Sequence, residues 1–141
     1  MTFTGIRLPE RSLEQEGSVS LLRAAALGQG VFYAVTGFWP VVHIRSFEAV
    51  SGPKHDDWLV KTVGLLLTVI GCVLSMAGMR RRMGIEIPLL GVGSALSLAA
   101  IDLVYVSRRR IPPIYLADAA GEGALASLWA IAWFWKPSSK P

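Results

Sequence analysis

The chain has 141 residues and a net charge of +4, and 52% of its residues are hydrophobic whereas only 17% are charged. This composition, with a mean hydropathy of +0.48, is typical of an integral membrane protein. The single cysteine, Cys72, excludes an intrachain disulfide and redox chemistry by a thiol pair. The basic excess suits anionic lipid headgroups, and no pattern of a nucleic-acid reader accompanies it, so we expect a lipid bilayer and no nucleic acid as partner.

The apolar residues fall into four segments, each of about twenty residues, the length that a helix needs to cross a ~30 Å hydrocarbon core. They cover residues 21–42, 59–79, 87–106 and 114–135. The sequence therefore predicts an all-α integral membrane four-helix bundle with up-down-up-down topology. The transmembrane domain would cover residues 20–135, between a polar N-terminal segment, 1–19, and a polar tail, 136–141.

The first apolar segment could be a signal peptide, because it lies close to the N-terminus. Three glutamates precede it (Glu10, Glu14 and Glu16), and no small-x-small cleavage site follows it. We therefore expect a true transmembrane helix.

Pro40 falls in the last turns of this helix and should kink or end it, because proline removes a backbone donor. Beyond it, Ile44, Phe47 and Val50 recur at helical spacing, until Gly52 stops the pattern. We predict a short helix along the membrane interface over this stretch. Asp56 can then cap the second span.

Three carboxylates, Asp102, Asp118 and Glu122, lie in the third and fourth apolar segments. An acid at membrane depth indicates function, because its burial is costly unless it faces protein, water or a partner. The loops after the first and third spans must lie on one side of the membrane, so the ends of four helices meet there. We expect a polar pocket on that side, formed by His43, Arg45, Lys61, Asp102, Asp118 and Glu122.

Asp118 and Glu122 are spaced i, i+4 and project from one helix face. Because two close carboxylates cannot both ionise cheaply in a medium of low dielectric, we expect the deeper Glu122 to be protonated and to donate a hydrogen bond. The aspartates could pair with Lys61, Arg45 or His43. The three acids are interpreted either as a proton or cation relay in a pocket, or as a polar clasp that sets the helix register.

Two arginine runs flank the spans and are expected to touch lipid headgroups. They are Arg80, Arg81, Arg82 and Arg108, Arg109, Arg110. The side that holds both termini and the middle loop carries eight Lys or Arg, against six on the other side. This bias favours cytoplasmic termini. His55, Asp56 and Asp57 could join His43 and Glu48 around a metal, but no dense ligand motif is present, so we expect no metal, no cofactor and no catalytic residue.

Glycine and alanine are dense in all four spans, and helix four contains small-xxx-small pairs such as Ala119 with Gly123. Such surfaces allow close packing either inside the bundle or against other membrane subunits or a second copy.

The run Leu21-Leu22-Arg23, followed by Gly28 and Gly37 in the first span, resembles the DoxX-like group of small bacterial membrane proteins. The stretch from residue 39 to 61 departs from that pattern and resembles other small bacterial four-span proteins. The resemblance implies multi-pass insertion in a bacterial inner (cytoplasmic) membrane and no particular chemistry.

Three functions remain open at this point. The first is a non-enzymatic accessory or assembly subunit of a larger membrane complex, which the small size and small-residue faces favour. The second is a proton- or cation-coupled carrier of a small solute that uses the intramembrane carboxylates. The third is a membrane-embedded enzyme that acts on a lipid with an acid pair.

Overall fold

The computed structural model describes residues 10–80 and 83–134, and every regular element in them is a helix. The helices are α1 (Glu10–Val42), α2 (Ile44–Ser51), α3 (Asp57–Met79), α4 (Glu86–Ser107) and α5 (Tyr115–Phe134). The predicted all-α class is thus confirmed for the described residues. α1 begins well before the predicted span from residue 21, and the predicted tail, 136–141, lies outside the described residues.

Within the described residues, three helical stretches are long and apolar enough to cross a membrane: Val19–Val42, Asp57–Met79 and Glu86–Ser107. They lie in α1, α3 and α4. α5 is not among them, although it has 20 residues, because Asp118 and Glu122 lower its hydropathy. Many large apolar side chains on the helices stay exposed, Val35, Leu66 and Leu89 among them. An exposed apolar surface of this extent is typical of a protein that lipid surrounds.

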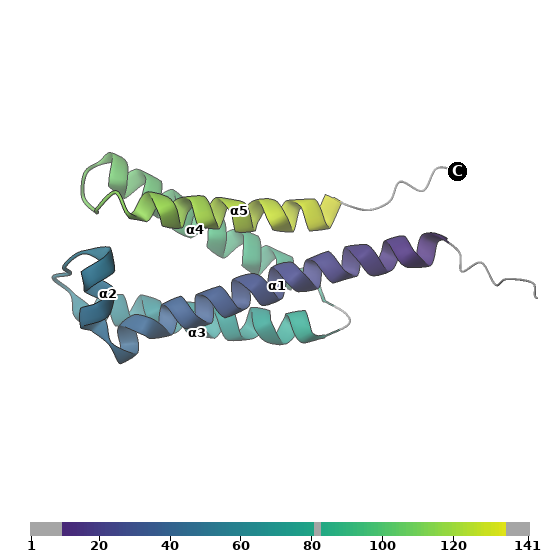
Figure 1. Cartoon of the computed structure of the whole chain (residues 1–141), viewed down its shortest axis with the longest axis horizontal. Helices are drawn as coiled ribbons and strands as arrows, with labels where there is room; N and C mark the ends of the chain where they lie inside the picture. The colour runs from purple at the N-terminus through teal and green to yellow at the C-terminus, as the bar shows by residue number, and fades with distance from the viewer. Residues whose placement is uncertain (1–9, 81–82, 135–141) are drawn as a thin grey trace, which may run out of the picture.

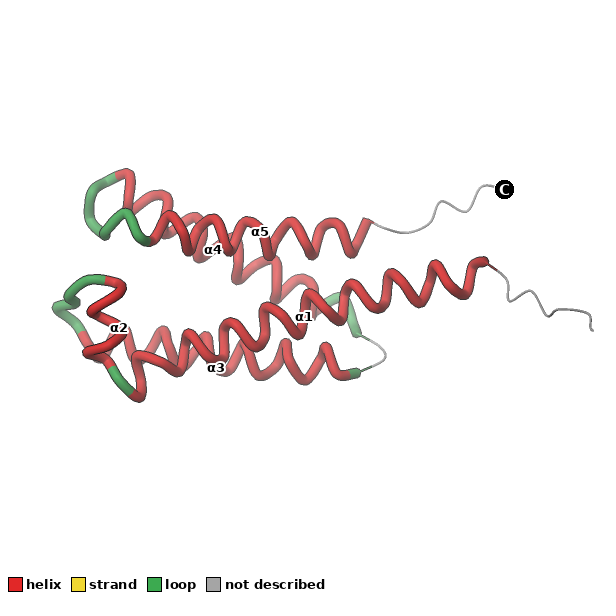
Figure 2. The backbone as a smooth tube through the Cα atoms, viewed as in Figure 1, coloured by secondary structure: helices red, strands yellow, loops and turns green. Residues whose placement is uncertain are grey.

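The four long helices form two antiparallel pairs that lie one over the other (Figures 1 and 2). α1 pairs with α3, and α4 pairs with α5. One end of the molecule holds α2 and the turn between α4 and α5, and we call it the α2 end. The start of α1, the end of α3, the start of α4 and the end of α5 lie at the opposite end (Figure 1).

The α1–α3 pair is held by glycines at heptad spacing. Gly30 and Gly37 of α1 face Gly71 and Gly64 of α3, and a Cβ atom at any of the four would run into the backbone of the other helix. The side chain of Arg23 adds a hydrogen bond from Nε to the Gly78 carbonyl oxygen at 3.0 Å near the end of α3. Close backbone approach of this kind stabilises helix pairs in membranes, where the hydrophobic effect does not drive helices together.

The two pairs pack together away from the α2 end. There Ala25 and Ala26 of α1, Leu74 of α3 and Trp129 of α5 form the buried core. Gly91 of α4 lies against the Trp129 indole and leaves no room for a Cβ atom. The large ring of Trp129 therefore fits between α4 and α1 because its neighbours are small, and the pairs diverge from this point toward the α2 end.

α1 stops at Val42, two residues after Pro40, as the sequence predicts for a proline in the last turns of a helix. His43 is the N-cap of α2, and its Nδ1 accepts a hydrogen bond from the Ser46 backbone N–H at 3.2 Å. α2 therefore exists where the sequence predicts a short helix. Asp56 holds the N-cap position of α3, but its side chain makes no capping hydrogen bond.

Two special backbone positions set the chain reversals at the α2 end. Gly52 has φ of 86° after α2, a conformation that glycine adopts without strain. Arg109 has φ of 54°, and the Arg110 N–H donates to the Tyr105 carbonyl oxygen at 2.9 Å. This is the left-handed ending common at helix C-termini, and it turns the chain back toward α5.

Candidate functional site

A cavity of about 550 Å³ lies between the two helix pairs at the α2 end. α1, α2, α3, α4 and α5 all contribute to its wall, and most of the lining side chains are apolar. Its volume falls within the ~300–1,000 Å³ that small-molecule sites usually have. The cavity exists because the close α1–α3 pair and the α4–α5 pair are in contact only farther along the molecule.

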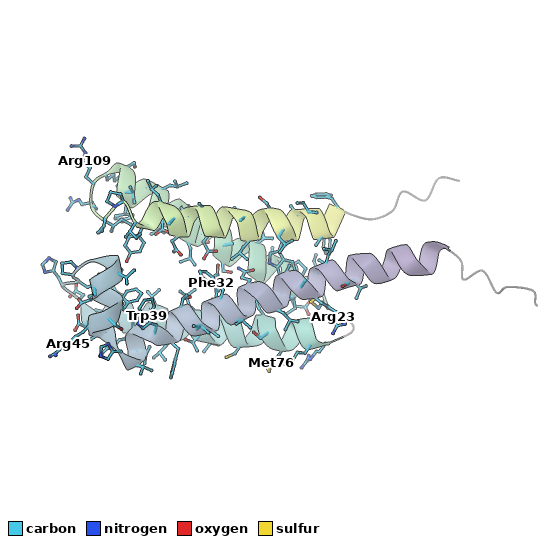
Figure 3. All side chains as sticks on the ribbon, in the orientation of Figure 1. Arg23, Phe32, Trp39, Arg45, Met76 and Arg109 are labelled. Carbon is cyan, nitrogen blue, oxygen red and sulfur yellow. The ribbon has the colours of Figure 1, made fainter. Side chains whose placement is uncertain are left out.

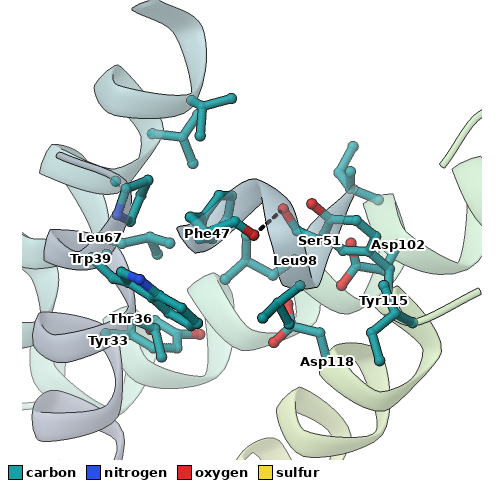
Figure 4. Close-up of a pocket in the computed structure, with 18 of the residues that line it drawn as sticks. Tyr33, Thr36, Trp39, Phe47, Ser51, Leu67, Leu98, Asp102, Tyr115 and Asp118 are labelled. Carbon is teal, nitrogen blue, oxygen red and sulfur yellow. Dashed lines mark hydrogen bonds between the residues drawn. The ribbon is translucent and has the colours of Figure 1, made fainter. Parts of the chain in front are cut away.

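All three carboxylates that the sequence places in the third and fourth apolar segments line this cavity: Asp102 from α4, and Asp118 and Glu122 from α5. Asp102 and Asp118 are near enough to interact electrostatically, and Glu122 interacts with the charge of both. Figure 4 shows Asp102 and Asp118 on the same side of the cavity, near Ser51 of α2. The acids therefore form one group, although they come from two helices.

Asp102 has an oxygen without a hydrogen-bond partner. The residue is only 6% exposed, and its Oδ2 atom is buried and unpaired among the described residues. Buried polar atoms are nearly always paired, because an unpaired one loses its hydration without compensation. An unpaired carboxylate oxygen in a cavity wall indicates a missing donor, which a proton shared with Asp118 or a bound cation would supply.

Glu122 is held from the opposite helix pair. The Tyr33 hydroxyl of α1 donates to Glu122 Oε2 at 2.5 Å, and both side chains are almost completely buried. The expectation that Glu122 itself donates stays a prediction. This contact makes Glu122 the deepest acid of the cavity and ties α1 to α5.

Gln29 continues the polar chain beyond Tyr33, one helical turn along α1. Its Nε2 donates to the Gly91 carbonyl oxygen at 2.9 Å, and its Oε1 accepts from Trp129 Nε1 at 2.6 Å. A single amide thus joins α1, α4 and α5 where the cavity ends. The inner end of the cavity is therefore held by directed hydrogen bonds between the helix pairs.

Lys54 is the only cation that lines the cavity among the described residues. Its Nζ donates to the Ser51 carbonyl oxygen at 3.0 Å and lies 4.9 Å from the centre of the Tyr115 ring. Both contacts hold the ammonium group near the chain reversals of the α2 end, away from Glu122. Three carboxyl groups against one ammonium group give the cavity a cation-attracting character.

An aromatic pair forms the wall opposite the aspartates. The Trp39 and Phe47 rings meet edge to face with centroids 5.8 Å apart, and Trp39 Nε1 donates to Ser46 Oγ at 2.7 Å. Figure 4 shows these rings on one side of the cavity and Asp102 and Asp118 on the other. A molecule in the cavity would therefore lie between the Trp39 and Phe47 rings on one side and the two aspartates on the other.

Three of the six residues predicted for the pocket do not line it. His43 caps α2, Arg45 lies exposed in the first turn of α2 and points outward (Figure 3), and Lys61 is half-buried on α3. No ion pair joins them to the acids within the parts of the chain that the structure describes. The aspartates therefore face the cavity and are not paired with the basic residues predicted as their partners.

The four arginines of the two runs that the structure describes do not line the cavity. Arg80, Arg108, Arg109 and Arg110 are exposed, and Figure 3 shows Arg109 extending from the α4–α5 turn. Arg81 and Arg82 lie outside the described residues. Headgroup contact by these residues stays a prediction.

A metal ion has no ready site in residues 10–80 and 83–134, since no group of three or more His, Cys, Asp or Glu side chains there could hold one. The cavity acids are backed by apolar and aromatic walls. The arrangement can bind a proton or a cation with an apolar part, and it offers no assembled set of metal ligands.

Sequence reasoning missed the residues that complete the site, namely Gln29, Tyr33, Ser51 and Lys54. A signal for the first two existed, because Gln29 and Tyr33 are polar residues at i, i+4 spacing inside an apolar span and so share one helix face. Lys54 had no such signal, since it follows a short helix and its position depends on the Gly52 turn.

The chain has no match among protein-family models, curated proteins or solved structures. The resemblance to the DoxX-like group stays a prediction.

Proposed function

We propose that this protein is a multi-pass membrane carrier in which α1, α3, α4 and α5 cross the bilayer, and in which the acid-lined cavity binds a small solute together with, or in exchange for, a proton or cation. The observation that carries the proposal is the convergence of all three intramembrane acids on one cavity, with Asp102 Oδ2 unpaired. A polar clasp that only fixes helix register would leave its polar atoms satisfied by neighbours.

α5 can be a fourth span despite its low hydropathy. Its two acids line the cavity, so their charge need not meet acyl chains, while Leu116, Ile131 and Phe134 remain exposed for lipid. A four-span bundle has both termini on one side, and the lysine and arginine bias favours the cytoplasm. We further propose the bacterial inner membrane as its location, on the resemblance described above.

Reconstitution into vesicles with an internal pH dye tests the carrier. We expect solute-driven proton movement in the native protein and its loss in Glu122→Gln, which keeps the size of the side chain. Glu86→Gln is the matched control, because Glu86 is exposed at the start of α4. The proposal is wrong if the native protein moves no proton or cation with any organic cation, neutral solute or organic anion supplied.

A second function is favoured by a different observation. Gly93 of α4 and Gly121 of α5 have open space where a Cβ atom would lie, and Gly28 of α1 does as well. These small-residue surfaces suit a helix of another subunit, as an accessory or assembly subunit would need. Mass measurement after purification in mild detergent separates the two, because an accessory subunit should purify with unrelated chains.

A further inference from the structure

We infer that the cavity binds an organic cation, a protonated amine on an apolar body, with its ammonium group between Asp102 and Asp118 and its apolar part against the Trp39–Phe47 wall. The inference rests on the proposed function and names its substrate class. It is argued from charge, size, wall chemistry and access.

Charge selects a cation. Asp102 is more than nine-tenths buried and has a free oxygen in the cavity wall, with Asp118 beside it. Two ionised carboxylates this close repel each other in a medium of low dielectric, and a bound ammonium group relieves the repulsion while donating to both. Lys54 cannot supply that charge where it lies, because its Nζ is engaged by Ser51 and the Tyr115 ring.

Size and wall chemistry select an organic cation over a bare ion. A cavity of about 550 Å³ is far larger than an inorganic ion fills. Leu67 of α3 and Leu98 of α4 line it beside the aromatic pair, so an apolar body would displace water at a gain. Aromatic faces also attract ammonium groups directly, as the Lys54–Tyr115 contact already shows in this protein.

Access favours a molecule that partitions into lipid. Leu59 and Val63 of α3 and Ile101 of α4 line the cavity, and each is more than 40% exposed. α3 and α4 make few contacts with each other, so we place the entrance of the cavity on this side. In a bilayer the surroundings of this side are acyl chains, and a lipophilic amine reaches the acids from the membrane interior.

The test measures calorimetric binding in nanodiscs of zwitterionic lipid with three matched probes: phenylbutylamine, phenylbutanol and phenylbutyrate. Empty nanodiscs correct for partitioning into lipid. We expect the amine to bind at least tenfold more tightly than the alcohol, and the carboxylate most weakly. Asp102→Asn and Asp118→Asn should each weaken amine binding at least tenfold and leave alcohol binding unchanged. Asp57→Asn, an exposed acid at the start of α3, is the control and should change neither.

Leu98→Trp provides a second variant that keeps all three acids and fills the cavity. It should abolish binding of the amine and of the alcohol alike, and it decides the question if an aspartate variant fails to fold. Equal affinity for amine and alcohol, or full amine affinity in Leu98→Trp, overturns the inference.

The carrier proposal and this inference fail differently. Amine binding that depends on Asp102, without movement of a proton or cation with the amine or any other solute supplied, leaves the inference standing and refutes the carrier. Proton movement with another solute, in a protein that does not bind the amine, does the reverse.

Discussion

The Tyr33 hydroxyl donates to Glu122 Oε2 at 2.5 Å, and this contact joins α1 to α5 across residues that lie 89 positions apart in the chain. It separates the inner hydrogen-bonded region around Gln29 from the cavity that Asp102 and Asp118 line. The deepest acid is therefore both part of the cavity wall and a structural link between the two helix pairs.

Replacing Tyr33 by Phe should lower the free energy of unfolding by about 1–3 kcal/mol, because the buried Glu122 carboxyl loses its donor. Reversible unfolding in mixed micelles, followed by circular dichroism, measures the change. Tyr105→Phe is the control, since Tyr105 is exposed at the end of α4. Equal stability of the two variants would show that Glu122 does not depend on the contact.

Gly71→Ala should destabilise the protein by about 1–3 kcal/mol, because the added Cβ meets the backbone of Gly30 and Ala34 and forces α1 and α3 apart. Gly93→Ala lies in an open position on α4 and should be neutral, or stabilise by up to about 1 kcal/mol through reduced backbone entropy in the unfolded chain. Unfolding in the same micelles compares the pair. The opposite order would place the α1–α3 contact elsewhere.

Lys54→Met should raise the affinity of the cavity for phenylbutylamine severalfold, because it removes the positive charge that lines the cavity and repels a bound ammonium group. Lys61→Met, a lysine of α3 that does not line the cavity, should leave the affinity unchanged. Calorimetry in nanodiscs reads out both. A similar effect of the two variants would indicate a general surface-charge effect instead of a local one.

Cys72 tests the membrane placement of α3. It is a free, exposed thiol near the middle of Asp57–Met79. In vesicles a charged maleimide should therefore fail to label it, whereas an apolar maleimide of similar size should label it. A Cys72→Ser/Ser107→Cys variant moves the thiol to the exposed end of α4 and should react with the charged reagent when added to permeabilised vesicles. Labelling of native Cys72 by the charged reagent would contradict a transmembrane α3.

Local and periodic features could be predicted well. Apolar segments locate α3 and α4 to within a few residues, and Pro40 and Gly52 bracket α2, because chain stiffness and missing donors act on neighbouring residues alone. The start of α1 was missed, since polar residues with good helix propensity, such as Glu10, Glu14 and Glu16, continue the helix beyond its apolar part.

The amino-acid sequence by itself determined which segments are apolar helices, where they turn, and which helices carry acids, because each of these depends on neighbouring residues. Only the tertiary structure decided that Asp102, Asp118 and Glu122 share one cavity, that Tyr33 and Gln29 complete it, and that His43, Arg45 and Lys61 lie elsewhere. The physical reason is that the rotation of each helix about its own axis decides which of its side chains face the cavity. Which side chain faces a neighbour follows from how the Gly30–Gly71 contact and the Trp129–Gly91 contact orient each pair, and these contacts join residues far apart in the chain.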